Sequence, residues 1–211
     1  MKLQLALDMV DTPTAERIVD QIYDVIDIVE IGTPMIIREG VRPVERIKEK
    51  YPNLTILADT KIVDGGEIES RYAFDAGADI VTVLGVAPEE TICAVVDVAN
   101  TYGRKCMADM LCISDIVENA VRLENLGVNY VCLHTAKDEQ TKKNAPLDEL
   151  SLLKGHLKQA KTAIAGGVNL NTIQSIVAIG AEIVVVGSAL TNAPDLRKAV
   201  LEMKAAIVRS R

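Results

Sequence analysis

The densest group of charged residues in this sequence is Asp59-x-Lys61-x-x-Asp64, which follows the apolar residues 55–58. Alternate residues of an extended segment point to the same side, so Asp59 and Lys61 are expected to lie together. A lysine between carboxylates keeps its proton, because nearby opposite charge favours the ammonium form. The motif therefore predicts a fixed cation for developing negative charge and argues against a Schiff-base amine.

Glu30 is a carboxylate inside a second apolar run, residues 26–31. An unpaired buried carboxylate is unfavourable, so a glutamate in this setting is usually functional. Together with Asp59 it offers oxygen ligands to Mg²⁺, an ion that commonly takes one or two carboxylates plus water and substrate oxygens. We therefore predict that Glu30 and Asp59 are metal ligands.

Three further polar residues, Asp8, Asp109 and His134, end or interrupt apolar runs. For Asp8, a helix N-cap and a site residue are both open interpretations. His134 ends its run among several carboxylates, which favours a role in proton transfer near neutral pH. His156 lies in polar sequence and is expected at the surface.

Two glycine-containing segments, Gly166-Gly167 and Gly187-Ser188, end the last two apolar runs. Glycine at such a turn can serve the backbone conformation alone. It also exposes backbone N–H groups that can bind phosphate. In barrels of alternating strands and helices, phosphate often binds in the loops after strands seven and eight, so we predict a phosphate site at these four residues.

The elements that position these residues repeat along the chain. Eight short apolar runs have the length of buried parallel strands: residues 3–8, 26–31, 55–59, 80–84, 105–110, 130–134, 162–165 and 183–187. Helical periodicity follows each run, at residues 12–23, 43–50, 67–76, 88–102, 114–126, 147–157, 170–179 and 195–208. Thr12 followed by Pro13 predicts a helix start with Thr12 as the N-cap.

Eight strand–helix units predict an α/β fold, a single (β/α)8 TIM barrel over residues 1–211. A helix end, a glycine and a strand start recur at residues 76–81, 126–131 and 179–184, which supports this architecture. An open doubly wound sheet is the alternative, weakened by the lack of Gly-x-Gly-x-x-Gly after the first strand. Because catalytic side chains of barrels project from the carboxyl ends of strands, the polar residues above should meet at one mouth.

Composition limits the classes of function. The net charge of −7 argues against a nucleic-acid partner, because phosphate backbones bind basic surfaces. No apolar stretch is long enough to predict a membrane helix, and the first residues lack a signal-peptide layout. The four cysteines have no zinc-site spacing and are expected to be reduced, in a cytoplasmic protein.

Six strings carry a family resemblance that runs from Lys2 almost to the C-terminus. They are residues 2–8 (KLQLALD), 29–34 (VEIGTP), 58–66 (ADTKIVDGG), 76–85 (AGADIVTVLG), 133–135 (LHT) and 163–167 (AIAGG). They resemble the 3-hexulose-6-phosphate synthases of the orotidine monophosphate decarboxylase suprafamily. The Asp-x-Lys-x-x-Asp motif is specific to the suprafamily. The other strings narrow the resemblance to the synthases and their sister family, the 3-keto-L-gulonate-6-phosphate decarboxylases.

This resemblance implies a Mg²⁺-dependent aldol condensation of formaldehyde with D-ribulose 5-phosphate through an enediolate. It also implies a homodimer in which Asp64 is supplied across the interface. Asp8 and Asp64 would orient Lys61 and the substrate hydroxyls. The expected site residues are catalytic His134, Lys61, Asp64 and Asp8, metal-binding Glu30 and Asp59, phosphate-binding Gly166, Gly167, Gly187 and Ser188, and substrate-binding Asp109.

The shared cluster cannot separate the two sister activities, so the choice depends on four other positions. The decarboxylases usually have Glu, Arg, Thr and Arg where this chain has Asp109, Lys137, Ala165 and Ser188. All four positions favour the synthase, although Lys137 restores a positive charge where synthases usually have a small or apolar residue. Decarboxylation is the alternative, with some side activity expected, and a non-catalytic sugar-phosphate sensor is a remote one.

Overall fold

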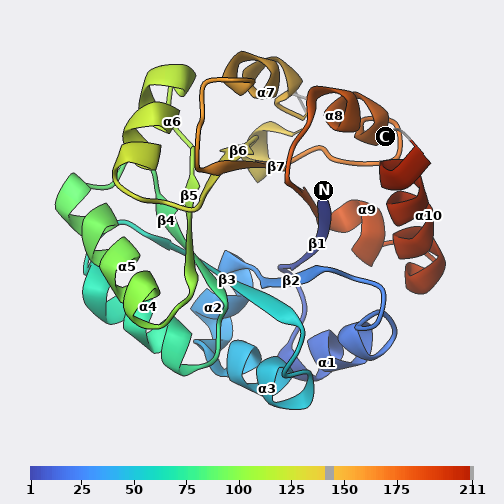
Figure 1. Ribbon diagram of the computed structural model, residues 1–211. Helices are drawn as coiled ribbons and strands as arrows, with labels where there is room; N and C mark the ends of the chain where they lie inside the picture. Colours follow the sequence, from blue (N-terminus) through green and yellow to red (C-terminus); the bar gives the residue numbers. More distant parts are fainter. Residues whose placement is uncertain (141–144, 210–211) are drawn as a thin grey trace.

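The computed structural model describes residues 1–140 and 145–209, and in this part of the chain parallel strands form a closed barrel. Neighbouring strands pair in chain order and the last pairs with the first, so the predicted (β/α)8 barrel is confirmed (Figure 1). The strands are β1 (Lys2–Leu7), β2 (Ile28–Ile31), β3 (Thr55–Ile62), β4 (Ile80–Leu84), β5 (Lys105–Asp109), β6 (Tyr130–His134), β7 (Lys161–Ala165) and β8 (Ile183–Val186).

Helices form a ring around the outside of the barrel (Figure 1). The helices of the described residues, including short ones outside this ring, are α1 (Thr12–Asp20), α2 (Thr33–Glu39), α3 (Arg42–Lys50), α4 (Gly66–Asp75), α5 (Glu89–Thr101), α6 (Ile116–Asn125), the 3-10 helix η1 (Lys137–Glu139), α7 (Leu147–Leu153), α8 (Ile173–Ile179), α9 (Ser188–Thr191) and α10 (Leu196–Arg209). Among the described residues, none of these helices has the length and apolar character needed to cross a membrane.

Strand side chains alternate between the space enclosed by the barrel and the layer beneath the helices. The apolar side chains in the enclosed space are Ala6, Ile28, Leu57, Ile80, Met107, Cys132, Ala163, Ala165, Ile183 and Val185, which we call the enclosed apolar layer. The outer layer is larger and includes Leu3, Leu5 and Leu7 of β1, packed together with apolar helix residues. Because both faces are buried, the strands appear in the sequence as nearly continuous apolar runs.

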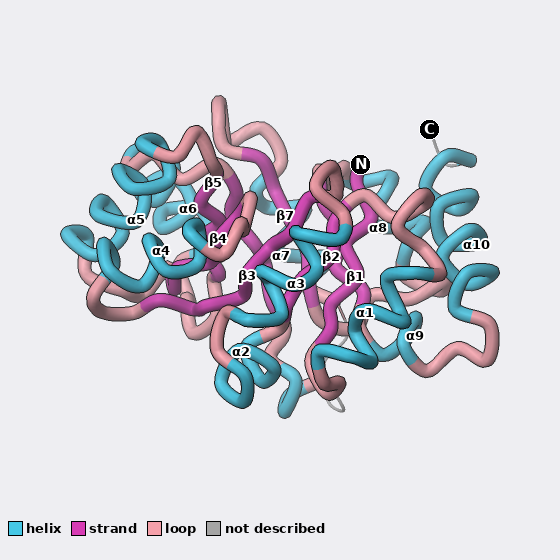
Figure 2. The backbone as a smooth tube through the Cα atoms, turned by 90° about the horizontal axis from the view of Figure 1, so that it is seen from below, coloured by secondary structure: helices cyan, strands magenta, loops and turns pink. Residues whose placement is uncertain are grey.

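The short helices α2 and α9 are additional to the predicted ones. α2 has Pro34 in its first turn, a start signal that apolar periodicity alone does not reveal. Figure 2 shows the N-terminus at one end of the barrel and α2 at the other. Since α2 directly follows β2, it marks the end of the barrel at which the parallel strands finish.

Helix α7 is shorter than predicted, because residues 154–157 are held in a loop and not in another helical turn. Gly155 has a φ of 83°, in the left-handed region. Oε1 of Glu124 accepts hydrogen bonds from the backbone N–H groups of residues 158–160, at 2.6 to 2.8 Å. These contacts bind the loop to the end of α6.

Two helix starts also differ from prediction. Thr12 is the first residue of α1 and not its N-cap, because the side chain of Asp11 accepts the N–H of Thr14 at 2.9 Å. α1 ends at Asp20, three residues before the predicted end. α8 begins three residues later than predicted, since the side chain of Asn169 accepts a backbone N–H in the preceding turn at 2.8 Å.

Asp79 joins several elements at the end of the barrel where the strands begin. Its Oδ2 accepts hydrogen bonds from Lys48 Nζ at 2.7 Å and from a backbone N–H of β3 at 2.8 Å, and its Oδ1 pairs with Arg104. Asp79→Ala removes the acceptor of Arg104 and of the β3 N–H, while Lys48 Nζ keeps the Leu54 carbonyl oxygen at 2.9 Å, so we expect the free energy of unfolding to fall by about 1–3 kcal/mol in urea titrations. Asp20→Ala removes an exposed carboxylate and should change stability little. Equal losses in the two variants would contradict this account.

Candidate active site

The residues predicted to form the site gather around one cavity of about 580 Å³ at the end of the barrel where the strands finish. Each of them ends, follows or interrupts a strand, so the parallel barrel brings together residues that are far apart in the sequence. Asp64 is the exception and does not line the cavity. Those that do are Asp8, Glu30, Asp59, Lys61, Asp109, His134, Gly166, Gly167, Gly187 and Ser188.

Lys61 lies between carboxylates, although regular strand alternation is not the reason. Its Nζ donates to Asp59 Oδ2 and, at 3.2 Å, to Thr33 Oγ1, and it lies 3.6 Å from Asp109 Oδ2. β3 shifts its register against β4 in this segment. Lys61 itself has a φ of 46°, in the left-handed region that few non-glycine residues adopt. The predicted proximity of Lys61 and Asp59 is confirmed, but the predicted backbone is wrong.

Two threonines that the sequence pattern does not single out hold this cluster in place. Thr82, buried on β4, donates its hydroxyl to Asp59 Oδ1 and accepts the backbone N–H of Lys61, both at 2.8 Å. Thr33, at the start of α2, lies 2.7 Å from the Asp59 carbonyl oxygen and 2.8 Å from Asp59 Oδ2. A hydroxyl inside the apolar run of residues 80–84 is the one sequence signal that could have marked Thr82.

The charges of this cluster stabilise one another. Burial alone lowers the pKa of Lys61, but the carboxylates of Asp59 and Asp109 outweigh burial and raise this pKa above its ordinary value. Burial raises the pKa of Asp59, yet the charge of Lys61 and the hydrogen bonds from Lys61, Thr33 and Thr82 bring it below its usual range. At neutral pH, Lys61 is therefore a cation and Asp59 an anion.

Glu30 is a buried carboxylate on β2 that is close enough to Asp59 to feel its charge. Burial first, and then the negative charge of Asp59, raises the pKa of Glu30 to about 8. Its Oε2 accepts a hydrogen bond from Gln4 Nε2 at 2.5 Å. Within residues 1–140 and 145–209, no three His, Cys, Asp or Glu side chains are grouped to hold a metal. Glu30 and Asp59 thus offer two carboxylates, and any further ligands must come from elsewhere.

The raised pKa of Glu30 makes the stability of the metal-free protein depend on pH. The folded protein keeps a proton that the unfolded chain, with its ordinary pKa of 4.5, loses as the pH rises toward about 8. This contribution is therefore complete below pH 4.5 and is lost as the pH rises through that window. Glu30→Gln stays neutral, so we expect its thermal midpoint to increase relative to the wild type from about pH 5 to about pH 8. Scanning calorimetry measures this, and a pH-independent difference would contradict it.

His134 and Asp109 form a pair on the wall of the cavity. His134 Nδ1 lies 2.8 Å from Asp109 Oδ2, and Asp109 Oδ1 accepts the backbone N–H of Leu111 at 3.0 Å. A carboxylate at Nδ1 fixes the ring orientation and leaves Nε2 for proton transfer. This contact with His134 is additional to the substrate-binding role predicted for Asp109.

Asp8 is not the cap of the following helix, because Asp11 fills that role. Its carboxylate lies against Gly32, where an added Cβ would come within 2.0 Å of Asp8 Oδ1. Burial raises the pKa of Asp8, while the positive charge of Lys137 opposes the rise. Of the two interpretations open from the sequence, the structure therefore favours a carboxylate in the cavity.

The turn after β7 exposes backbone to the cavity. Gly166 and Gly167 have φ values of 83° and 73°, and a Cβ at Gly166 would lie 2.3 Å from the Thr135 carbonyl oxygen. Asn169 and Thr172 donate to the Gly167 carbonyl at 3.1 and 3.3 Å and so hold the turn. In the part of the chain that the structure describes, no hydrogen bond occupies the N–H groups of the two glycines, which leaves them available to a ligand.

Asp64 is exposed and lies outside the cavity of its own chain. Its Oδ1 accepts the backbone N–H of the neighbouring residue, Gly65, at 2.7 Å, and not a hydrogen bond from Lys61. Within one chain, the structure therefore does not bring Asp64 to the lysine that it was expected to orient.

The positions expected to separate the two sister activities all line the cavity. Lys137 begins η1, Ala165 ends β7 and Ser188 begins α9, and Asp109 ends β5. The charge of Lys137 reaches Asp8, as its effect on the pKa of that carboxylate shows. A ligand bound in this cavity would therefore lie beside these four side chains.

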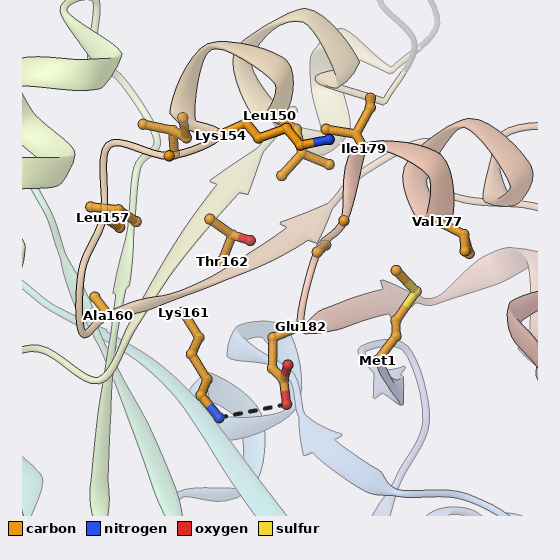
Figure 3. Close-up of a pocket in the computed structure, with 14 residues that line it drawn as sticks. Met1, Leu150, Lys154, Leu157, Ala160, Lys161, Thr162, Val177, Ile179 and Glu182 are labelled. Carbon is orange, nitrogen blue, oxygen red and sulfur yellow. Dashed lines mark ion pairs between the residues drawn. The ribbon is translucent and has the colours of Figure 1, made fainter. Parts of the chain in front are cut away.

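A second cavity, of about 430 Å³, lies at the opposite end of the barrel, where β7 and β8 begin. Figure 3 shows Leu150 and Leu157 beside it and the ion pair between Lys161 and Glu182, at 3.8 Å. None of the predicted site residues lines this cavity. Since active sites of such barrels form where the strands finish, we place the candidate active site in the first cavity.

Known proteins resemble this chain over its whole length. The family model described as orotidine 5'-phosphate decarboxylase / HUMPS matches residues 1–203. A 3-hexulose-6-phosphate synthase of Bacillus subtilis (strain 168) is 43% identical over 209 residues, which are 99% of this chain and 100% of that protein. The crystal structure of 3-hexulose-6-phosphate synthase from Salmonella typhimurium has a TM-score of 0.96 at 40% identity and covers 100% of both chains.

A more distant structure, 3-keto-L-gulonate-6-phosphate decarboxylase from Vibrio cholerae O1 biovar El Tor str. N16961, has a TM-score of 0.88 at 26% identity, over 100% of this chain and 98% of the other. The likeness to the two synthases is thus greater than the likeness to this decarboxylase. The resemblance to 3-hexulose-6-phosphate synthases is confirmed. The chain is an enzyme, and it belongs to the orotidine 5'-phosphate decarboxylase / HUMPS family.

Proposed function

We propose that this enzyme is a 3-hexulose-6-phosphate synthase, an aldehyde-lyase that condenses formaldehyde with D-ribulose 5-phosphate to give D-arabino-hex-3-ulose 6-phosphate. The relatives of that name, at 43% and 40% identity, support the proposal. The observation that carries it is geometric: one cavity contains both the charged cluster around Lys61 and the turn at Gly166 and Gly167. A phosphate bound at the glycines would hold the reacting end of a short sugar near Lys61 and His134.

Glu30 and Asp59 are the residues that would hold Mg²⁺. Two buried carboxylates, one of which raises the pKa of the other, fit a divalent cation that offsets their repulsion. Asp59 Oδ2 already accepts from Thr33 and Lys61, whereas Oδ1 accepts from Thr82 alone and keeps capacity for a ligand. When bound, Mg²⁺ is a Lewis acid that polarises substrate oxygens.

The side chains of the enzyme carry out the proton transfers. His134 Nε2 takes a proton from C1 of ribulose 5-phosphate while Asp109 holds Nδ1. Lys61 stabilises the negative charge of the resulting enediolate. C1 then attacks the formaldehyde carbon. The C=O bond of formaldehyde opens to an alkoxide while the C2 carbonyl of the sugar forms again, and the alkoxide takes the proton back from His134. Asp8, in the same cavity, is placed to bind substrate hydroxyls.

The proposal includes a homodimer in which Asp64 completes the site of the partner. Asp64 is exposed and outside its own cavity, yet it belongs to the motif that supplies Lys61. The nearby side chains of Val63, Ile68 and Tyr72 are 51%, 54% and 59% exposed. Exposed apolar side chains so near one another in the sequence are consistent with a contact between subunits.

Decarboxylation of 3-keto-L-gulonate 6-phosphate is the second candidate function. Lys137 favours it, because this lysine places a positive charge at the cavity where the decarboxylases usually have arginine. Asp109, Ala165 and Ser188 favour the synthase, and the higher identity to the synthases agrees with them. We therefore expect decarboxylation as a side activity only.

Parallel assays test the assignment: loss of formaldehyde in the presence of ribulose 5-phosphate, and release of CO₂ from 3-keto-L-gulonate 6-phosphate, each with and without Mg²⁺. We expect formaldehyde loss to dominate, to stop with a chelator and to return with Mg²⁺. CO₂ release should be weaker and should fall in Lys137→Ala. Dominant CO₂ release would overturn the synthase in favour of the decarboxylase, and no turnover of either substrate would favour a sugar-phosphate sensor.

A further inference from the structure

Gln4 is a buried amide whose register partners on the two neighbouring strands are apolar. It lies on β1, is 1% exposed and lines the active-site cavity. Its register partners, Ile28 on β2 and Val185 on β8, both belong to the enclosed apolar layer. A side chain of similar size without polar atoms would fill this position by packing alone, so packing does not explain the amide.

The Gln4 amide is only half satisfied. Its Nε2 donates to Glu30 Oε2 at 2.5 Å. Across residues 1–140 and 145–209, Gln4 Oε1 is the single buried side-chain nitrogen or oxygen that lacks a hydrogen-bond partner. Burying an amide oxygen without a partner is unfavourable. The unpartnered Oε1 therefore lowers the stability of the protein, and the hydrogen bond from Nε2 to Glu30 is what the amide provides in return.

Each carboxylate of the proposed cation site has its own hydrogen-bond donors. Thr33 and Thr82 hold Asp59. Among the described residues, Gln4 is the hydrogen-bond donor to Glu30, and none reaches Glu30 Oε1. The contact therefore occupies one oxygen of the carboxylate, limits its rotation and leaves the other oxygen free.

We propose that Gln4 is a positioning residue for the divalent cation: it fixes the Glu30 carboxylate through Oε2 and so presents Oε1 to the ion. The inference rests on the proposed cation site at Glu30 and Asp59. Partners that orient a metal-binding side chain typically change metal affinity by about 10–100-fold when they are removed. A residue that served packing alone would affect stability and not this affinity.

Direct binding of Mn²⁺ to the full-length protein, followed by the EPR signal of the free ion, tests the proposal without an activity assay. Gln4→Met keeps the volume of the side chain and removes the donor, so we expect the dissociation constant for Mn²⁺ to rise by about 10–100-fold. Its thermal midpoint without the ion should change little, because removal of the unpartnered Oε1 offsets the loss of the hydrogen bond to Glu30. Gln4→Asn, which withdraws the amide by one methylene, should weaken Mn²⁺ binding in the same direction and provides the measurement if Gln4→Met does not fold.

Ile183→Leu is the matched control, because Ile183 belongs to the same enclosed layer but does not line the cavity. It should bind Mn²⁺ like the wild type, whereas Glu30→Gln should lose the site. If Gln4→Met and Gln4→Asn bind Mn²⁺ as tightly as the wild type while Glu30→Gln does not, Gln4 does not position the ligand and only this inference fails. If the wild type itself binds no Mn²⁺ at Glu30, the cation site of the proposed function fails and this inference is overturned with it.

Discussion

Replacing His134 by asparagine is expected to lower kcat by about 10²–10⁴-fold, the range that a positioned general base contributes. Asparagine has nearly the shape of part of the imidazole ring, but its amide cannot take a proton at neutral pH. His134 is suited to this role because Asp109 Oδ2, 2.8 Å from Nδ1, holds the ring and leaves Nε2 free. Steady-state kinetics with ribulose 5-phosphate and formaldehyde measures the loss.

A second measurement isolates the proton transfer from carbon–carbon bond formation. In heavy water without formaldehyde, the wild type should exchange the C1 proton of ribulose 5-phosphate with solvent, and His134→Asn should do so far more slowly. Binding of ribulose 5-phosphate should change little, because the turn at Gly166 does not depend on His134. His156→Asn is the matched control, since His156 is exposed and does not line the cavity. Unchanged C1 exchange in His134→Asn would show that another group is the base.

The members of the cavity could be predicted because their side chains are costly to bury. Glu30, Asp109 and His134 interrupt or end apolar runs, and such residues need a partner or a function. Parallel strands then place the ends of all runs at the same mouth of the barrel. Membership of the cavity thus follows from local sequence together with one rule of topology.

The backbone conformation and the hydrogen bonds that support the contacts within the cavity could not be predicted in the same way. Lys61 reaches Asp59 from a backbone with a φ of 46°, and nothing in the local sequence favours that conformation for a lysine. Lys61 is held in this conformation by Thr82 on β4 and Thr33 at the start of α2, both more than 20 residues away in the chain. Such long-range hydrogen bonds leave no periodic trace in the sequence.

The ends of helices show the same limit. Leu157 continues the helical spacing of Leu150 and Leu153, but α7 ends at Leu153, two residues before Gly155. The competing interaction comes from Glu124, whose carboxylate accepts three backbone N–H groups from residues more than 30 positions later. Local propensity alone cannot foresee an acceptor on another helix.

Replacing Lys61 by methionine should lower kcat by about 10²–10³-fold, the effect of removing one preorganised group that stabilises developing negative charge. Methionine keeps much of the length of the side chain but lacks the ammonium group that contacts Asp59 Oδ2 and Thr33 Oγ1. Since Lys61 also opposes the rise in the pKa of Asp59 that burial causes, Asp59 in the variant should hold its proton to a higher pH. The pH profile of the residual activity should therefore move its acidic limb to higher pH.

Two controls separate charge at this position from charge in general. Lys50→Met removes a cation from an exposed ion pair, 44% and 45% exposed, and should leave kcat unchanged. Lys61→Arg keeps the charge but replaces a compact ammonium group by a planar guanidinium, which the contacts with Thr33 and Asp59 do not fit, so it should recover only part of the lost activity. The thermal midpoint of each variant, measured beside the kinetics, shows whether the protein remains folded. If folded Lys61→Met kept kcat within about threefold of the wild type, far short of the expected loss, Lys61 would serve only to neutralise buried carboxylates, and the negative charge of the enediolate would be stabilised by other groups.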